Sequence, residues 1–370
     1  MKGNSELITV SAEELKKMVS AIFRGRGLSE RDSGIMSDSL VHANLRGTDS
    51  HGVMRAPHYI QRVDSGSINP CPDAKVVRTG PATAMMDGDH GFGHVSNWDA
   101  MGVAIEIAQE SGVGFVGVNH SNHCGALSFF AHRAVEAGLI GIVFTQTDKG
   151  VVPHGGRVPF CGTNPLCFGI PAKSGAPIVL DMATSTVAGG HIYTARIQNR
   201  PIPPTWALDS DGQPTTDPHK AAFWTPMAGA KGYGLGVIID ILTGILSGGA
   251  YGPHIAVMYG DLDKKRNLCH LVGALDFRRF AGSDAFLEQV TAMAADLHNA
   301  PAAEGFDRVL VPGEPEHLRA IERSRNGIPL DDSVWKELTA LIPPRQGVAT
   351  PCPSGKDHME LAVNDEGGNR

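Results

Sequence analysis

The sequence predicts an α/β protein in which helical segments at both ends of the chain flank a mixed sheet. Three observations predict this class: helical periodicity over the first 45 residues, alternation of short β-rich runs with helical segments between residues 80 and 190, and two short helical segments before Pro343. Such alternation is typical of sheets that helices cover. At roughly 150 residues per domain, the 370 residues correspond to about two and a half domains.

Two helices are expected within the first 45 residues. The first has a capping-box pattern at Ser11 and Glu14, and its apolar residues recur at helical spacing. They are Leu15, Met18, Val19, Ile22 and Phe23. Ser29 is the expected N-cap of the second helix. The stretch 66–72, rich in Gly, Pro and Ser, predicts a linker.

Strands and helices are expected to alternate through the middle of the chain. Helical periodicity predicts helices at 95–111 and 128–137. Apolar, β-rich runs predict strands at 113–118, 139–145 and 177–181. The run 82–87 has poor strand character, and 195–220 is expected to be loop because it is rich in Pro, Asp and Thr.

The C-terminal part begins with residues 234–246, which are apolar on nearly every face and predict a buried helix. Strands are expected at 271–275 and 307–311. Between them, 283–300 predicts a capped amphipathic helix with four inward-facing residues: Phe286, Val290, Met293 and Leu297. The last 25 residues are polar and predict a frayed tail.

The composition argues against several classes of protein. Lys and Arg number 32 against 39 Asp and Glu, a net charge of −7, which disfavours nucleic-acid binding. The sequence contains no run of 18 apolar residues, so we expect no membrane-spanning helix. The first residues are polar and lack the apolar run of a signal peptide. The six cysteines are scattered without a Cys-x-x-Cys pair, so we expect no disulfide framework and a cytoplasmic location.

The first candidate for chemistry is the run Ser50, His51 and Gly52 with Arg55 four residues after the histidine. An imidazole beside a hydroxyl suits proton transfer, and a guanidinium offers a planar fork for a substrate carboxylate. The alternative is a helix start that Ser50 caps. From the residues alone, the structural interpretation as a helix start is favoured.

A second candidate follows the strand predicted at 113–118, where His120 and His123 are three residues apart. Catalytic groups gather at the carboxyl ends of strands in α/β sheets. Proton transfer by one of these histidines is favoured over a metal site. A metal site and a loop-capping histidine remain the other interpretations.

The usual dinucleotide fingerprint is absent. Residues 91–96 come close to it but lack its third glycine, so a turn at a helix entry is favoured there. Residues 229–236 place Lys231 and several glycines at the start of a helix, which suits an anion or a pyrophosphate. Close helix packing through the same glycines is the alternative.

Six stretches, in the same order along the chain, resemble the type-2 malate/L-lactate dehydrogenase family. They are residues 48–55, 122–126, 152–156, 162–165, 181–184 and 230–234, and the likeness runs from about residue 8 to 342. The family includes ureidoglycolate and sulfolactate dehydrogenases, diketogulonate reductase and cyclic-imine reductases. Residues 258–262 and 266–268 look most like ureidoglycolate dehydrogenase.

The resemblance implies hydride transfer between NAD or NADP, with NAD favoured, and a small 2-hydroxy or 2-oxo acid. It implies the family's non-Rossmann fold and a homodimer with its active site between domains. His51 and His123, with Ser50, are the implied catalytic residues. We expect His51, oriented by Ser50, to be the general base and His123 to be the polarising group or the alternative base. Arg55, Tyr59 and Thr163 are the implied substrate contacts. The implied cofactor contacts are Thr147, Asp181, Met182, Ala183, Lys231, Gly232, Pro312, Gly313 and Glu314. No metal is expected.

The resemblance also implies a division of the chain. We expect a helical domain at 1–70 and 315–345, a cofactor-binding domain at 71–118 and 225–314, a substrate domain at 119–224 and a flexible tail at 346–370.

Other functions stay open. Within the family, a reductase of a cyclic imine or a diketo-sugar acid is the alternative. Outside it, the alternatives are a His-metal hydrolase and a non-catalytic nucleotide-binding protein.

Overall fold

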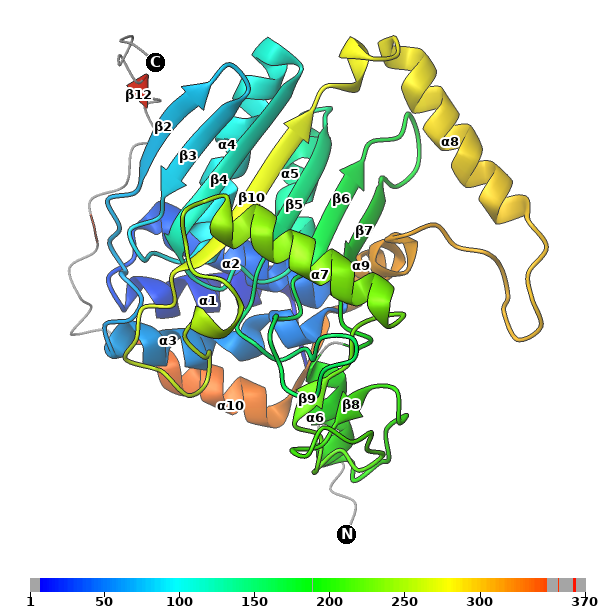
Figure 1. Cartoon of the computed structure of the whole chain (residues 1–370). Helices are drawn as coiled ribbons and strands as arrows, with labels where there is room; N and C mark the ends of the chain where they lie inside the picture. Colours follow the sequence, from blue (N-terminus) through cyan, green and yellow to red (C-terminus); the bar gives the residue numbers. More distant parts are fainter. Residues whose placement is uncertain (1–6, 188, 345–351, 353–361, 364–370) are drawn as a thin grey trace.

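A mixed sheet forms the centre of the molecule (Figure 1). The computed structural model describes residues 7–187, 189–344, 352 and 362–363, and within them the sheet has eight strands in the order β12-β2-β3-β4-β10-β5-β6-β7. β3–β4 and β12–β2 are parallel pairs, and the other neighbours are antiparallel. The strands are β2 Lys75–Gly80, β3 Thr83–Asp87, β4 Val113–Ser121, β5 Ile140–Thr145, β6 Leu166–Ile170, β7 Ile178–Met182, β10 Leu268–Leu275 and β12 Ala362–Val363. The predicted mixed α/β class is confirmed.

Helices cover both faces of this sheet. α4 Gly93–Ser111 and α5 Ser128–Glu136 pack on one face, and α7 Ala230–Asp240 lies across the other with its π-helical continuation Ile241–Ile245 (Figure 1). One large core joins the sheet to α4, α5 and the N-terminal helices. A smaller core lies around α6 Gly189–Ile197 and the hairpin of β8 Ala207–Leu208 and β9 Phe223–Trp224.

Helices from the N-terminal and C-terminal parts of the chain form a layer below the sheet (Figure 1). α10 Asp332–Leu341 packs against α1 Ala12–Arg24 and α3 Ala56–Asp64, while α9 Glu314–Asn326 packs against α2 Glu30–Leu45. β1 Leu7–Val10 pairs with β11 Ile328–Asp331. The predicted helical N- and C-terminal parts are confirmed.

Both predicted N-terminal caps are present. Ser11 Oγ accepts from the backbone N–H of Glu14 at 3.2 Å, and Ser29 Oγ accepts from that of Asp32 at 3.0 Å. Each bond satisfies one of the N–H groups that the first turn of a helix leaves unpaired. The apolar stripe of α1 is buried as predicted at Leu15, Val19, Ile22 and Phe23.

Two strand predictions were wrong. The run 82–87, predicted to be a poor strand, contains β3, because Ala84 and Met86 alternate with polar or less buried residues and face the core. The run 307–311 is a loop instead of a strand. There Glu314 holds the chain by accepting from Arg308 at 3.0 Å and from the N–H of Val311 at 3.1 Å. β2 and β6 were not predicted.

The helix predicted at 234–246 exists within α7 and its continuation, but its full burial was wrong. Gly236 and Ile239 face the protein, while an apolar ridge faces outward. This α7 ridge consists of Leu235, Ile238, Ile241, Ile245 and Leu246, which are 36–61% exposed. The helix at 234–246 therefore has two apolar faces, and the described part of the chain covers only one of them.

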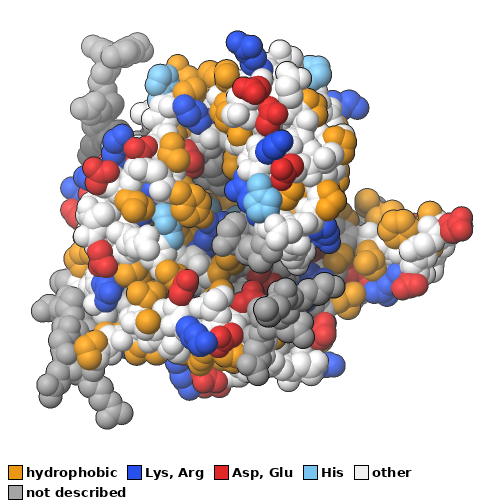
Figure 2. Space-filling view, turned by 90° about the horizontal axis from the view of Figure 1, so that it is seen from below, with side chains coloured by type: hydrophobic (Ala, Val, Ile, Leu, Met, Phe, Trp, Pro, Cys, Tyr) orange, Lys and Arg blue, Asp and Glu red, His pale blue; other side chains and the backbone are white. Residues whose placement is uncertain are grey.

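α8 Ser283–Asn299 forms as predicted but does not pack as predicted. Phe286 stacks on Phe277 with ring centroids 4.4 Å apart, whereas Met293 is 58% exposed, so its predicted inward position was wrong. The N-cap position is Gly282, which offers no side-chain cap. α8 and the loop after it form an arm that stands out from the body (Figures 1 and 2).

Other predictions hold in part. The region 195–220 is mostly loop, although it includes the end of α6 and the strand β8. The predicted tail at 346–370 lies largely outside the described residues. The described exceptions are β12 and Cys352, whose thiol forms a disulfide with Cys71, a pairing that the sequence did not predict. In the described part of the chain, no helix has the length and apolarity needed to span a membrane. The division into domains stays a prediction.

Candidate active site

Two imidazoles from distant parts of the chain lie face to face. His51 ends the short 3-10 turn Asp49–His51, and His123 follows the end of β4. Their ring centroids are 5.6 Å apart and the ring planes differ by 22°. The structure therefore brings together the two histidines that the sequence singled out at separate motifs.

A hydroxyl orients each ring. Ser50 Oγ lies 3.0 Å from Nδ1 of His51, and the hydroxyl of Tyr59 lies 2.7 Å from Nδ1 of His123. The N–H of Gly125 also donates to Nδ1 of His123, at 3.3 Å. A nitrogen that accepts an N–H carries no proton, so neutral His123 carries its proton on Nε2. Among the described residues, hydrogen bonds of both rings involve Nδ1, which leaves Nε2 for a ligand.

Both imidazoles are neutral near pH 7. Burial, with a smaller contribution from the charge of Arg55, lowers the pKa of His51 to about 4. Burial and the nearby His51 and Arg55 lower the pKa of His123 well below its ordinary value. Burial raises the pKa of Tyr59, so its hydroxyl keeps the proton that it donates to His123. Neutral imidazoles suit proton acceptance and hydrogen bonding to a substrate oxygen.

The predicted carboxylate-binding residue lies beside this pair. Arg55 Nε donates to the carbonyl of Ser50 at 2.6 Å, which fixes the guanidinium next to His51. The same guanidinium lies 5.8 Å from the ring centroid of Tyr259, whose ring is also 4.6 Å from that of His58. The positively charged guanidinium of Arg55 is thus held beside the His51–His123 pair.

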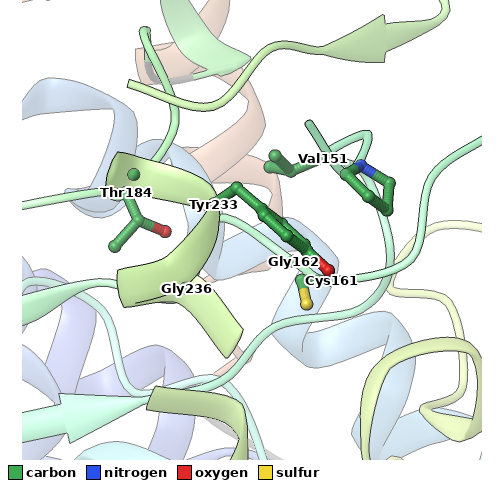
Figure 3. Close-up of a pocket in the computed structure, with 8 residues that line it drawn as sticks. Val151, Cys161, Gly162, Thr184, Tyr233 and Gly236 are labelled. Atoms are coloured by element: carbon green, nitrogen blue, oxygen red, sulfur yellow. The ribbon is translucent and has the colours of Figure 1, made fainter. Parts of the chain in front are cut away.

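Thr147 and Thr163 form a second group. The N–H of Thr163 donates to Thr147 Oγ1 at 2.9 Å, and the N–H of Thr147 donates to Oδ1 of Asn164 at 3.0 Å. Asn164 in turn donates to the carbonyl of Gly236 in α7 at 2.9 Å. A small cavity opens beside this group at the start of α7, with the ring of Tyr233 lying across it (Figure 3). It is lined by Val151, Pro153, Cys161, Gly162, Thr184, Gly232, Tyr233 and Gly236.

The start of α7 is suited to an anion. Its N-cap residue, Gly229, has no side chain to cap the first turn, and Lys231 is exposed there. In that turn the N–H of Gly232 donates to the carbonyl of Met227 at 2.9 Å. Gly232 packs on the backbone of Met227, where a Cβ would lie 2.8 Å from the Met227 nitrogen. Free N–H groups and a Lys side chain at a helix N-terminus are a suitable seat for a pyrophosphate.

The remaining predicted cofactor contacts lie on β7 or beside it. The N–H of Val179 donates to the carbonyl of Pro312 at 3.0 Å, so residues 312–313 lie along the strand that leads to Asp181, Met182 and Ala183. Two of the carboxylates already have protein partners. Asp181 accepts from the N–H of Ser128 at 2.8 Å, and Glu314 pairs with Arg308 and with His298 at 2.7 Å.

The sequence missed a buried ion pair next to the site. Asp148 accepts from Arg266 and from the N–H of Met258 at 3.2 Å, and the Arg266 side chain is only 1% exposed. The Arg266 charge contributes to the low pKa of His123. The sequence did contain a signal for this pair. Asp148 is next to Thr147, a predicted cofactor contact, and Arg266 belongs to the stretch 266–268, which was used only to judge likeness to a subfamily.

His120 lies in a different environment from His123. Its Nδ1 is 3.0 Å from Asp87 Oδ2, and its ring centroid is 5.2 Å from that of His90. The two histidines of the 120–123 stretch therefore have separate partners. In the part of the chain that the structure describes, no group of three or more His, Cys, Asp or Glu residues is placed to hold a metal ion.

Comparisons with known proteins agree with this fold. A model of the malate/L-lactate dehydrogenase family matches residues 10–339. Ureidoglycolate dehydrogenase (NAD(+)) of Escherichia coli K12 is 36% identical over 329 residues, 89% of this chain and 94% of that enzyme. The structure of sulfolactate dehydrogenase from Methanocaldococcus jannaschii superposes with a TM-score of 0.85 at 34% identity, over 90% of this chain and 96% of that one. The structure of malate dehydrogenase from Entamoeba histolytica gives a TM-score of 0.86 at 29% identity, over 91% of this chain and 97% of that one.

The family match and the fold define an NAD(P)-dependent dehydrogenase of 2-hydroxy acids with a mixed sheet. This confirms the enzyme class that the sequence predicted. The chain belongs to the malate/L-lactate dehydrogenase family.

Proposed function

We propose that this protein oxidises a small 2-hydroxy acid of the malate, L-lactate or ureidoglycolate type with NAD, and reduces the corresponding 2-oxo acid in reverse. The observation that carries the proposal is the stacked pair of His51 and His123 with Arg55 beside it. These groups supply a neutral base, a second imidazole and a cation for the substrate carboxylate. The relatives whose names specify ureidoglycolate, malate and sulfolactate support the substrate class.

In the oxidation, the hydroxyl proton of the substrate moves to Nε2 of His51 while the hydride on C2 leaves. Ser50 Oγ, 3.0 Å from Nδ1, accepts from the N–H on that nitrogen and leaves the Nε2 lone pair free for the proton. His123, which carries its proton on Nε2, donates a hydrogen bond to the same substrate oxygen. A positioned base of this kind contributes about 10²–10⁴ in rate.

The substrate carboxylate binds the guanidinium of Arg55, with Tyr59 and Thr163 as further contacts. The Ser50 carbonyl holds Arg55 by its Nε, so the direction of the fork is set before substrate arrives. A charged pair at this point fixes C2 of the substrate relative to the imidazoles.

Bound NAD supplies the hydride acceptor. Lys231 and the N-terminus of α7 would hold its pyrophosphate. Thr147, Gly232 and the backbones of 181–183 and 312–314 would contact the rest of the dinucleotide. The engagement of Asp181 with Ser128 and of Glu314 with Arg308 supports contact through backbone atoms in these segments.

We also propose a homodimer. The α7 ridge and the arm of α8 present apolar side chains to the outside, including Ile245 at 53% and Met293 at 58% exposure. An apolar surface of this kind is typical of a protein–protein contact. A second copy of the chain is the proposed partner, since dimerisation would shield the small cavity at the start of α7 from water.

The test is an initial-rate assay that follows the absorbance of the reduced nicotinamide. NAD and NADP are each offered with ureidoglycolate, malate, L-lactate and sulfolactate, and the reverse assay includes a cyclic imino acid. The last substrate is included because the structure of delta1-piperideine-2-carboxylate reductase from Pseudomonas syringae matches with a TM-score of 0.82 at 28% identity. Turnover of a 2-hydroxy acid supports the proposal, and turnover of the imine alone contradicts it.

A further inference from the structure

Residues 91–96, which nearly match a dinucleotide fingerprint, have no part in the chemistry above. They lie at the start of α4, against the backbone that carries His123. Gly93 is the first residue of α4, and a Cβ there would clash with the carbonyl oxygen of Asn122 and lie 2.8 Å from the carbonyl carbon of His123. This glycine is therefore needed for close contact between the helix and the site backbone.

The turn before α4 is tied to the same backbone. The side-chain amide of Asn122 donates to the carbonyls of His90 and Gly91, both at 2.9 Å. Contacts before and at the start of α4 thus fix the segment that carries His123. Residues 91–96 therefore help to fix the position of the His123 imidazole and do not form a phosphate-binding loop.

The next residue, His94, reaches the functional side chains themselves. Its ring is fully buried and lies edge-to-face on Tyr59, with centroids 5.2 Å apart at 77°, and 6.3 Å from the ring of His123. Gly125 makes room for it, because a Cβ at that position would lie 2.7 Å from Nε2 of His94. Tyr59 and His94 together therefore enclose His123.

His94 is an unusual choice for such a buried place. Neither ring nitrogen has a hydrogen-bond partner among the described residues, and burial lowers its pKa to about 3, so the ring is neutral. A buried polar group without a partner costs free energy. Its presence beside two functional side chains points to a function in the site and not in the stability of the core.

We infer that His94 is a positioning residue for His123. By packing edge-on against Tyr59, it keeps the Tyr59 hydroxyl on Nδ1 of His123 at 2.7 Å and so leaves the N–H of Nε2 directed at the substrate oxygen. The inference rests on the proposed function, because it concerns how His123 is held for that reaction. His94 itself touches neither substrate nor cofactor in this assignment.

The first experiment compares His94→Ala with Met101→Ala. Met101 is also fully buried on α4 but lies seven residues further along, so it controls for the loss of a buried side chain from the same helix. We expect His94→Ala to lower kcat by roughly 10²-fold with the KM for NAD unchanged, because small misplacements of a reacting group are costly. Met101→Ala is expected to keep kcat within about threefold. Equal losses of kcat in the two variants would overturn the inference.

A double-mutant cycle with Tyr59→Phe shows whether His94 acts through the Tyr59–His123 bond. The Tyr59→Phe variant already lacks the hydrogen bond between the Tyr59 hydroxyl and Nδ1 of His123. We therefore expect His94→Ala to lower kcat by less than about threefold in that background. A further loss of the full size found in the single variant would show that His94 acts by another route and would refute the inference.

A readout independent of activity separates this inference from the proposed function. Nitrogen NMR of labelled histidine reports which ring nitrogen of His123 carries the proton. We expect the Nε2 proton in the unaltered protein and in Met101→Ala. We expect loss of that single form in His94→Ala, because Tyr59 and Gly125, which both direct a hydrogen at Nδ1 of His123, both lie against the His94 ring. If the unaltered protein turned over no 2-hydroxy acid but gave these spectra, the proposed function would fail and the positioning role would stand. Unchanged His123 signals in His94→Ala would refute the positioning role.

Discussion

At the residue scale, the neighbours of each imidazole decide what it can do. Ser50 can either donate to or accept from Nδ1 of His51, so this ring can hold its proton on either nitrogen. His123 lacks that freedom, because the N–H of Gly125 and the hydroxyl of Tyr59 both point at its Nδ1. The two histidines are thus similar in burial and different in role.

The variant His51→Ala removes the proposed base. We expect kcat for the 2-hydroxy acid to fall by about 10²–10⁴-fold, the usual contribution of a general base. Titration of the protein with NADH, followed by fluorescence, is expected to give an unchanged Kd. His120→Ala is the matched control, since that histidine is exposed and pairs with Asp87 away from the site. If His51→Ala kept turnover within about threefold, the assignment of the substrate proton to His51 would be wrong.

The variant Arg55→Lys keeps the positive charge but loses the planar fork. We expect KM for the acid to rise by about tenfold with a smaller change in kcat, because an ammonium cannot bind a carboxylate through two parallel bonds. Steady-state kinetics at saturating NAD measure the change. Arg26→Lys, at the exposed ion pair with Asp64, is the control. An unchanged KM in Arg55→Lys would remove this residue from the substrate site.

The sequence could predict the identity of these residues better than their surroundings. His51, His123 and Arg55 stand in short motifs, so residue type and spacing were enough to single them out. The Asp148–Arg266 pair lies 118 residues apart in sequence, and no local pattern announces a contact between them. The partner of Nδ1 in each ring likewise depends on how separate segments pack.

At the element scale, local signals predicted the helices well. The side-chain caps of α1 and α2 involve residues three apart, so the sequence itself contains both partners. β3 was missed because a strand of five residues has only two core-facing positions, Ala84 and Met86, to show its alternation. The loop at 307–311 was mistaken for a strand because a short apolar run does not show whether another strand pairs with it.

The α7 ridge gives a prediction at this scale. The double variant Ile238→Lys/Ile245→Lys places two positive charges on the exposed α7 ridge. Because burying these charges in an apolar contact is costly, we expect the double variant to be a monomer where the unaltered protein is a dimer. Light scattering after size-exclusion chromatography measures the mass. Leu318→Lys, on an exposed apolar position of α9, is the control and is expected to leave the dimer intact. A monomeric unaltered protein, or a dimer that survives both charges, would contradict the assignment of the ridge to dimerisation.

At the scale of the whole molecule, the class of fold was predictable and the order of the strands was not. β10 lies between β4 and β5, and these pairings join residues more than 100 positions apart. Periodicity identifies an element but carries no information about its distant neighbours. The likeness of six ordered motifs to a known family supplied the rest of the fold, and the family match over 10–339 bears it out.

Buried neutral histidines make a prediction about the stability of the whole molecule. Burial lowers the pKa of His51 to about 4 and the pKa values of His94 and His270 to about 3, against 6.5 in an unfolded chain. Because the folded values are lower, the unfolded chain binds more protons below pH 6.5. The stabilisation is therefore full above pH 6.5 and is lost progressively as the pH falls toward about 3, the folded-state pKa of His94 and His270.

Urea unfolding curves measure this loss. We expect the free energy of unfolding to be lower at about pH 5 than at about pH 7, and His270→Gln to reduce that difference because it removes one buried imidazole. His219→Gln, at an exposed position, is the control and is expected to keep the full difference. A free energy of unfolding that stays constant between these two pH values would contradict the buried, neutral state of these rings.

The most direct measurement of the central claim is a crystal structure of the protein with NADH and a non-reacting 2-oxo acid analogue. The account predicts that the C2 oxygen of the analogue lies within hydrogen-bond distance of Nε2 of both His51 and His123, with its carboxylate on Arg55 and the nicotinamide against C2. An analogue bound away from the paired imidazoles, or with its carboxylate on a different cation, would contradict the account.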